Sequence, residues 1–572
     1  MIVRVWAPAA RRVECVIEGK ARAMQREQRG HWTCEVEIGA SYAFLLDGEG
    51  PFPDPRSRWQ PRGVHEASVA LRLDEFEWKD DTFTPVPLSH AVLYELHVGT
   101  FSPSGTYAGA AEKLPYLRDL GVTHIELMPL ATFPGNHGWG YDGVCLYAPH
   151  PAYGPPRQLQ ELVQAAHDEG IAVLLDVVYN HLGPDGNHLE RFGPYFTDRY
   201  RTPWGPAVNF DGPGSDEVRA FFIDNALAWL RDYHFDGLRL DAVHAILDTR
   251  AVHFLEELTA RVRQLEESMG RRLVLVAESD ANDPRLVWPL ERGGFGLDAH
   301  WMDDFHHALH AALTGERDGY YADFGSIEQL AHALRRAYVF EGQYSGFRDR
   351  SHGRPRENVR QDQMVVFSQN HDQVGNRGFG ERLSQIVDVP ALKAAAALVL
   401  LGPFVPLLFQ GEEWAASTPF LYFTDHQNAE LARAVREGRR REFAAFDWEG
   451  RGQVPDPQAP ETFAASRLRW EELATEPHAQ MHAWYREMLK LRREHGAGDL
   501  VHVELDEKQS VLLLQRDRLI VAINIGEAAV AVEPPPGAWE VVCASAEDCA
   551  WQSLPRHGVL VVRGKGDGLL LS

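Results

Sequence analysis

Residues 237–244, GLRLDAVH, are a short apolar run that ends in charged and polar side chains, and this pattern recurs along the chain. Apolar runs of this length that alternate with helical segments are typical of buried strands in a parallel sheet. Seven further runs follow the pattern: AVLYELHV from Ala91, HIELMP from His124, AVLLDVV from Ala172, LVLVAE from Leu273, FGLDAHW from Phe295, MVVFSQNH from Met364 and VPLLFQG from Val405. Eight such repeats predict an α/β fold, a closed (β/α)8 TIM barrel, which we place at residues 89–496.

The sequence predicts β-structure in the regions on either side of the barrel. Residues 1–88 contain alternating runs such as VRVWAP and CEVEIG, separated by turns with Gly and Pro, and they predict an N-terminal β-sandwich. Residues 497–572 return to runs such as SVLLLQ and LIVAIN, which predict a small all-β C-terminal domain.

Charge and composition limit the classes of molecule that this protein is expected to bind. The 572 residues include 57 basic and 82 acidic side chains, a net charge of −25, which disfavours nucleic acid and anionic membranes. The opening stretch MIVRVWAPAA lacks the features of a secretion signal, and no apolar stretch is long enough to span a bilayer. Five scattered cysteines favour neither a disulfide framework nor a zinc site. We therefore expect a cytoplasmic protein with a neutral substrate.

Carboxyl groups follow several of the predicted strands, at the end of the barrel where catalysis takes place. The runs end in DVVYNH (176–181), GLRLDAVH (237–244), VAE (276–278) and QNHD (369–372). Strand periodicity puts Arg239 and Asp241 on one face, where the guanidinium favours an ionised carboxylate. Glu278 shares a face with Val274 and Val276, and apolar surroundings favour a protonated acid. Each carboxyl taken singly is more often a helix cap or an ion-pair partner.

The four motifs in this order resemble the signature regions of the α-amylase superfamily of glycoside hydrolases. The resemblance implies a retaining mechanism in which Asp241 is the nucleophile, Glu278 the general acid/base and Asp372 the stabiliser of the transition state. It also implies that further residues bind the substrate sugar: Tyr141, Asp142, His181, Arg239 and His371. Aromatic side chains in the predicted strand-end loops are placed to stack on sugar faces, although each alone more often packs in a core: Trp139, Tyr141, Tyr153, Trp204 and Trp301. No cofactor and no metal are implied.

Longer stretches resemble one family of this superfamily, the maltooligosyltrehalose trehalohydrolases. They include WGYDGVCLYAPHPAYGPP (139–156), FDGLRLDAVHAI (235–246) and QNHDQVGNRGFGERL (369–383). The resemblance implies cleavage of the α-1,4-glucosidic bond beside a terminal trehalose unit, with release of trehalose and a maltooligosaccharide. It places Trp301, Asp304 and Phe305 along the trehalose end of the cleft. It further implies a metabolic link to maltooligosyltrehalose synthase, without indicating physical contact.

Two other functions stay open. A glycogen branching enzyme carries the same three carboxylates behind an N-terminal β-sandwich, although its second region usually continues Asp-Ala-Val-Ala-Ser. Here His244 stands near the leaving-group sugar, unless it is a buried histidine that satisfies a backbone carbonyl. A non-catalytic α-glucan-binding protein is the alternative of another class.

Two groups of residues resemble metal ligands without predicting a metal site. DDFHHALH (303–310) offers ligands at helical spacing, but the proposed chemistry does not call for a metal. Asn180 matches a position that can bind calcium in secreted members of the superfamily, but no second ligand cluster accompanies it.

Overall fold

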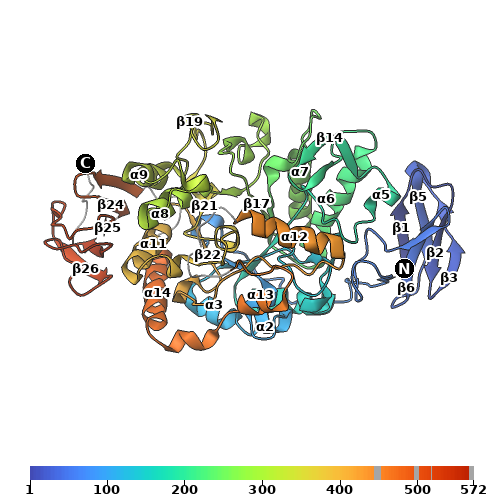
Figure 1. Ribbon diagram of the computed structural model, residues 1–572, viewed down its shortest axis with the longest axis horizontal. Helices are drawn as coiled ribbons and strands as arrows, with labels where there is room; N and C mark the ends of the chain where they lie inside the picture. Colours follow the sequence, from blue (N-terminus) through green and yellow to red (C-terminus); the bar gives the residue numbers. More distant parts are fainter. Residues whose placement is uncertain (444–452, 495–500, 517, 566–572) are drawn as a thin grey trace.

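Eight parallel strands close a barrel at the centre of the chain, with β-structure at both ends of the molecule (Figure 1). The computed structural model describes residues 1–443, 453–494, 501–516 and 518–565. All eight predicted runs contain a barrel strand, so the (β/α)8 prediction is confirmed. In chain order the strands are β9 (Leu93–Leu96), β10 (His124–Leu127), β13 (Ala172–Val177), β16 (Gly237–Leu240), β17 (Val274–Ala277), β18 (Ala299–Trp301), β21 (Met364–Val366) and β22 (Val405–Phe409).

Strand periodicity sorts the side chains of β16 between two layers. Leu238 and Leu240 pack into the large core shared with the helices, whereas Arg239 points into the barrel. A side chain at Gly237 would collide with the neighbouring strand, since its Cβ would lie 2.3 Å from the carbonyl oxygen of Val274. Glycine at the start of β16 therefore allows the close approach of β17 that brings two strand ends together.

Helices cover the outside of the barrel and connect its strands (Figure 1). β17 and β18 are joined only by the short 3-10 turns Pro284–Leu286 and Leu290–Arg292. None of the helices in the described ranges is both long and apolar enough for a membrane span. The main covering helices are α3 (Leu114–Leu120), α4 (Pro156–Asp168), α6 (Ser215–Asp232), α7 (Phe254–Met269), α8 (Asp303–Thr314), α9 (Ile327–Arg336), α11 (Val389–Leu401) and α14 (His478–Glu494).

The N-terminal region forms two antiparallel sheets that bury side chains in a common core. The turn Leu88–His90 then leads into β9, next to the domain boundary predicted at residue 88. One sheet has the order β1–β5–β4, with β1 (Ile2–Trp6), β5 (His31–Glu35) and β4 (Gln25–Arg26). The other has the order β3–β2–β6–β7, with β8 also paired to β6; these are β3 (Lys20–Ala23), β2 (Val13–Ile17), β6 (Ser41–Leu46), β7 (Glu49–Phe52) and β8 (Ser68–Val69).

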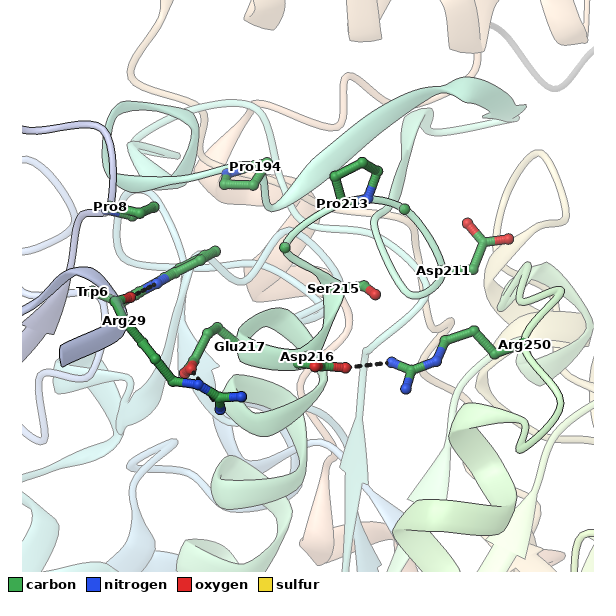
Figure 2. Close-up of a pocket in the computed structure, with 12 residues that line it drawn as sticks. Trp6, Pro8, Arg29, Pro194, Asp211, Pro213, Ser215, Asp216, Glu217 and Arg250 are labelled. Atoms are coloured by element: carbon green, nitrogen blue, oxygen red, sulfur yellow. Dashed lines mark hydrogen bonds and ion pairs between the residues drawn. The ribbon is translucent and has the colours of Figure 1, made fainter.

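A groove of about 560 Å³ marks the contact between the N-terminal sheets and the start of α6 (Figure 2). Trp6 crosses this contact, and its indole nitrogen donates a hydrogen bond to the backbone carbonyl of Arg29 at 3.0 Å. On the barrel side, Arg250 binds Asp216 at 2.8 Å. Trp6 also packs edge-on against Tyr195 at 5.5 Å. Trp6 therefore contacts residues of both domains, Arg29 in the N-terminal region and Tyr195 in the barrel region.

Buried ion pairs attach the segment before β9 to the barrel. The carboxylate of Asp80, which is 3% exposed, accepts hydrogen bonds from His167 at 2.8 Å, His234 at 2.9 Å and Arg271 at 3.0 Å. Burial opposes ionisation of Asp80, but the hydrogen bonds from His167 and His234 hold its pKa well below the usual range. Asp236 also binds His167 and Arg271, so removing Asp80 would halve the number of carboxylates that face these two cations and would leave His234 without its carboxylate partner.

The C-terminal region is an antiparallel sheet in the order β23–β24–β25–β27–β26. It packs beside the barrel, where Arg335 of α9 donates a hydrogen bond to the carbonyl of Val503 at 2.8 Å. The boundary predicted between residues 496 and 497 lies outside the described residues. The strands are β23 (Val501–Asp506), β24 (Val511–Arg516), β25 (Leu519–Asn524), β26 (Trp539–Ala544) and β27 (Val559–Gly564).

Candidate active site

The guanidinium of Arg239 is the centre of a carboxylate cluster inside the barrel. This buried group donates hydrogen bonds from Nη1 to Asp176 at 2.8 Å and to Asp241 at 2.9 Å. Its Nη2 lies 3.7 Å from Glu278 Oε2, and its Cζ lies 4.3 Å from the centre of the Trp301 ring. Burial lowers the pKa of Arg239, but the surrounding acids raise it well above its ordinary value. One fixed cation thus draws together carboxyl groups from three neighbouring strands.

Asp241 is held by donors on both of its carboxylate oxygens. Arg239 takes Oδ1, and the side-chain amide of Asn180 donates to Oδ2 at 2.7 Å and to the backbone carbonyl of Asp241 at 2.8 Å. The Asp241 side chain is 12% exposed, so it is fixed in orientation yet reaches the solvent side of the barrel. A carboxylate held this way is suited to act as a nucleophile.

Glu278 is placed beside Asp241 through the backbone of Ala242. The amide of Ala242 donates a short hydrogen bond to Glu278 Oε2. Ala242 adopts the left-handed conformation with φ 38°, an unusual geometry for a residue with a Cβ. Burial and the charges of Asp241, Asp372 and Asp303 raise the pKa of Glu278 well above its ordinary value, although Arg239 lowers it. A raised pKa suits a general acid, which has to be protonated before it can donate.

Asp372 lies in the first turn of the short helix α10 (His371–Gly375). Asn370 caps this helix, since its side chain accepts hydrogen bonds from the backbone amides of Asp372 at 2.9 Å and Gln373 at 3.3 Å. The Asp372 side chain is 41% exposed and lies 3.5 Å from His371 Nε2. The cap therefore fixes the backbone while the carboxylate stays available to a ligand.

Aromatic side chains surround these carboxyls. The hydroxyl of Tyr141 donates to Asp176 at 2.6 Å and lies 2.8 Å from His371 Nε2, and the two rings stack at 5.2 Å. Trp139 packs edge-on against His371 and donates its indole N–H to the carbonyl of Leu421 at 2.9 Å. Tyr141 and Trp139 thus form a rigid apolar wall of the kind that packs against sugar faces.

A second group of polar side chains lies next to Tyr141. His181 stacks on the exposed Trp204 at 4.8 Å, and its Nε2 lies 3.1 Å from the carbonyl of Tyr141. Asp142 lies 3.8 Å from His426 Nε2. Burial raises the pKa of Asp142, while His426 and His181 lower it.

Many of the side chains described above line a cavity of about 470 Å³ at the carboxyl ends of the strands. The predicted residues on its wall are Trp139, Tyr141, Asp142, His181, Asp241, His244, Glu278 and Asp372. His244 is exposed, which contradicts its alternative interpretation as a buried histidine. Arg239 and His371 are fully buried and lie directly behind the wall, in contact with residues that line it.

Three predicted residues do not line the cavity, and their placement is corrected. Trp301 is 1% exposed inside the barrel, where it packs against the guanidinium of Arg239. Phe305 is fully buried in the core. Asp304 is 2% exposed and accepts hydrogen bonds from Asn282 at 2.7 Å and from the amide of Phe340 at 2.8 Å. Trp301 at the end of β18 and the other two residues, in the first turn of α8, all direct their side chains into the protein interior.

Sequence reasoning missed several residues of the site. Asp176 and Asn180 stand in the quoted motif DVVYNH, but neither was predicted to contact Arg239 or Asp241. Glu95, in the middle of β9, binds His371. A charged residue in a fully buried strand was the signal that could have revealed it. The cavity wall also includes Asp280, Asn376, Tyr422 and Thr424, which were not predicted, and Trp204, which was predicted among the aromatic candidates.

Neither group that resembled metal ligands forms a metal cluster in the described structure. His306 binds the carbonyl of Ser368 at 2.8 Å, and His310 binds Glu316 at 2.8 Å. Asn180 is turned toward Asp241. Among the described residues there is no group of three or more His, Cys, Asp or Glu side chains that could hold a metal ion.

The barrel with its carboxylate cavity defines a glycoside hydrolase of the α-amylase type, and comparisons with known proteins agree. The family model for the alpha amylase catalytic domain matches residues 74–201, and a domain of unknown function, DUF3459, matches residues 498–561. A crystal structure of a Salmonella typhimurium protein whose name carries the words alpha amylase superposes with a TM-score of 0.90 at 38% identity, covering 98% of this chain and 97% of the other.

Sequence relatives identify the family. The malto-oligosyltrehalose trehalohydrolase of Arthrobacter ramosus is 49% identical over 538 residues, which cover 92% of this chain and 93% of the relative. A 1,4-alpha-glucan branching enzyme of Xanthomonas campestris is 30% identical, but the match covers 54% of this chain and 48% of that enzyme. The chain belongs to the malto-oligosyltrehalose trehalohydrolase family.

Proposed function

We propose that this protein hydrolyses the α-1,4-glucosidic bond next to the terminal trehalose unit of maltooligosyltrehalose, releasing trehalose and a maltooligosaccharide. Family membership supports the substrate. The observation that carries the reaction is the convergence of Asp241 and Glu278 on one guanidinium at the wall of a cavity. The metabolic link to a synthase and the cytoplasmic location stay predictions.

The geometry supports a retaining mechanism. Retention requires two carboxyl groups roughly 5 Å apart, so that one can attack the anomeric carbon directly. Glu278 accepts from the amide of Ala242, the residue that follows Asp241, which keeps the two carboxyls close. Glu278 would protonate the glycosidic oxygen while Asp241 forms a covalent glycosyl ester. Glu278 would then take a proton from the water that releases the sugar.

The remaining residues have roles in holding the sugar. We propose that Asp372 binds hydroxyl groups of the ring being cleaved, since its carboxylate is exposed at the cavity and its backbone is fixed by a helix cap. Tyr141 would stack on that ring, while Asp142 and His181 would bind its hydroxyls. His244 would face the sugar on the leaving side.

Product analysis tests this function against the two alternatives. The purified protein is incubated with maltotriosyltrehalose and, separately, with amylose, and the products are separated by chromatography. We expect free trehalose and maltotriose from the first substrate. New α-1,6 branches in amylose would support a branching enzyme, and binding without turnover would support a non-catalytic glucan-binding protein. Either outcome would overturn the proposal.

A further inference from the structure

Glu95 lies in the barrel interior behind the cavity wall and has no role in the mechanism above. It stands in the middle of β9, is 1% exposed and directs both carboxylate oxygens at His371. Oε2 accepts the backbone amide of His371 at 2.9 Å, and Oε1 makes a short hydrogen bond with the imidazole Nδ1. One side chain thus holds both the backbone and the ring of His371.

The hydrogen-bond partners of His371 determine its protonation state. Nδ1 faces the acceptor Oε1 of Glu95, so Nδ1 carries a proton. Nε2 faces the hydroxyl of Tyr141, whose single proton is already donated to Asp176 at 2.6 Å. Nε2 therefore has to be the donor in that contact as well. A ring with protons on both nitrogens is a charged imidazolium.

We infer that Glu95 is a positioning residue that holds His371 as an imidazolium, and that this cation fixes Tyr141 and Asp372 on the cavity wall. His371 Nε2 is the link, since it lies 2.8 Å from the Tyr141 hydroxyl and 3.5 Å from Asp372 Oδ1. The protonation of His371 follows from this hydrogen-bond geometry when the carboxyls of Glu95 and Asp176 are ionised. The kinetic consequence rests on the proposed function.

The electrostatic surroundings agree with a charged ring. Burial lowers the pKa of His371, and Arg239 lowers it further, but Glu95 and Asp372 raise it to about 9. The titratable groups that face His371 come from several elements: Glu95 on β9, His97 after it, Glu126 on β10, Tyr141, Asp176 on β13, Arg239 on β16 and Asp372 on α10.

The neighbouring strand supplies a matched control. Glu126 on β10 pairs in register with Glu95 on β9, and it is also 1% exposed. Within the described structure, neither carboxylate oxygen of Glu126 has a hydrogen-bond partner. Burial and the charge of Glu95 raise the pKa of Glu126 well above its ordinary value. The raised pKa favours the protonated form of Glu126, so we expect Glu126→Gln to leave the charge behind the site nearly unchanged.

The experiment measures the protonation of His371 directly. The protein is labelled with ¹⁵N-histidine, and the ring signals of His371 are assigned by their loss in His371→Gln. We expect both ring nitrogens to be protonated at pH 8 in the wild type and in Glu126→Gln. In Glu95→Gln the apparent pKa should fall by at least about one unit. A neutral His371 in the wild type at pH 8 would overturn the inference even if Glu95→Gln failed to fold.

Kinetics separate positioning from a general loss of structure. Glu95→Gln should lower kcat more than it changes KM, and its rate relative to the wild type should rise as the pH falls, because acid restores the imidazolium. A constant ratio at all pH values, or an equal change in Glu126→Gln, would contradict the inference. The titration needs no substrate, so a protein that failed to release trehalose would refute the proposed function without affecting this result.

Discussion

The side-chain amide of Asn180 holds Asp241 at two points, the carboxylate Oδ2 at 2.7 Å and the backbone carbonyl at 2.8 Å. This contact joins the loop after β13 to the end of β16. The orientation of Asp241, the proposed nucleophile, therefore depends on a residue that does not line the cavity.

We expect Asn180→Ala to lower kcat by roughly a hundred-fold with little change in KM, because a mobile Asp241 would seldom be aligned for attack. Steady-state kinetics with maltotriosyltrehalose provide the measurement. The control is Asn225→Ala, which removes another buried amide, one that binds Tyr179 and the carbonyl of Leu146. If the two variants lost activity equally, the special role of Asn180 would be refuted.

Replacing either of the two carboxyls proposed to react should strongly reduce turnover. We expect Asp241→Ala and Glu278→Gln each to reduce kcat by about three orders of magnitude or more, with the fold retained. Circular dichroism and thermal unfolding check the fold, and trehalose release measures turnover. A rate within ten-fold of the wild type in either variant would exclude the assigned role.

The raised pKa of Glu278 predicts the pH dependence of catalysis. Because Glu278 has to be protonated to donate, kcat/KM should decline as the pH rises through its pKa. The charge of Asp303 contributes to the raised value, so Asp303→Asn should move this decline to lower pH. Asp362→Asn makes the same charge change at the opposite end of the barrel strands, before β21, and should leave the profile in place. An unmoved profile in Asp303→Asn would count against this electrostatic account.

The ion pairs of Asp80 predict acid sensitivity of the fold. Its pKa is lowered in the folded state, so its contribution is complete above the unfolded value of about 4 and is lost as the pH falls toward the folded value. Asp236 remains as a partner of His167 and Arg271, so we expect Asp80→Asn to lower the free energy of unfolding at pH 7 by roughly 1.5–3 kcal/mol. Denaturant unfolding at pH 7 and pH 3 measures both effects.

The control for Asp80 is Asp74→Asn, which removes an exposed partner of Arg72. Such a surface pair contributes at most about 1 kcal/mol. The prediction fails if the two variants differ by less than that amount at pH 7, or if the gap between them does not narrow at pH 3.

The barrel could be predicted from the sequence because each strand is a short run buried on both faces. The three carboxyls could be predicted for a related reason: Asp241, Glu278 and Asp372 all follow strand runs, and parallel strands end at one edge of a barrel. The period of two along a strand also indicates which way Asp241 and Glu278 face. Asp372 lies in α10, beyond the end of β21, and its role was predicted from the resemblance.

The inward-facing partners were harder to predict, because they depend on rotation and register. Trp301 ends β18 as Glu278 follows β17, yet Trp301 points inward and packs beneath Arg239. In the first turn of α8, Asp303 remains close enough to Glu278 to influence its pKa, whereas Asp304 turns toward backbone amides. A rotation of 100° per residue separates these outcomes, and sequence spacing does not fix the starting angle.

Arg239 is a single positive charge shared by Asp176, Asp241 and Glu278. When one of these acids gains or loses a proton, the attraction felt by the other two changes, so a measured titration belongs to the whole set. For the same reason, losses caused by replacing these acids one at a time should not sum to the loss caused by replacing two together. Only a double-mutant cycle built around Arg239 would apportion them.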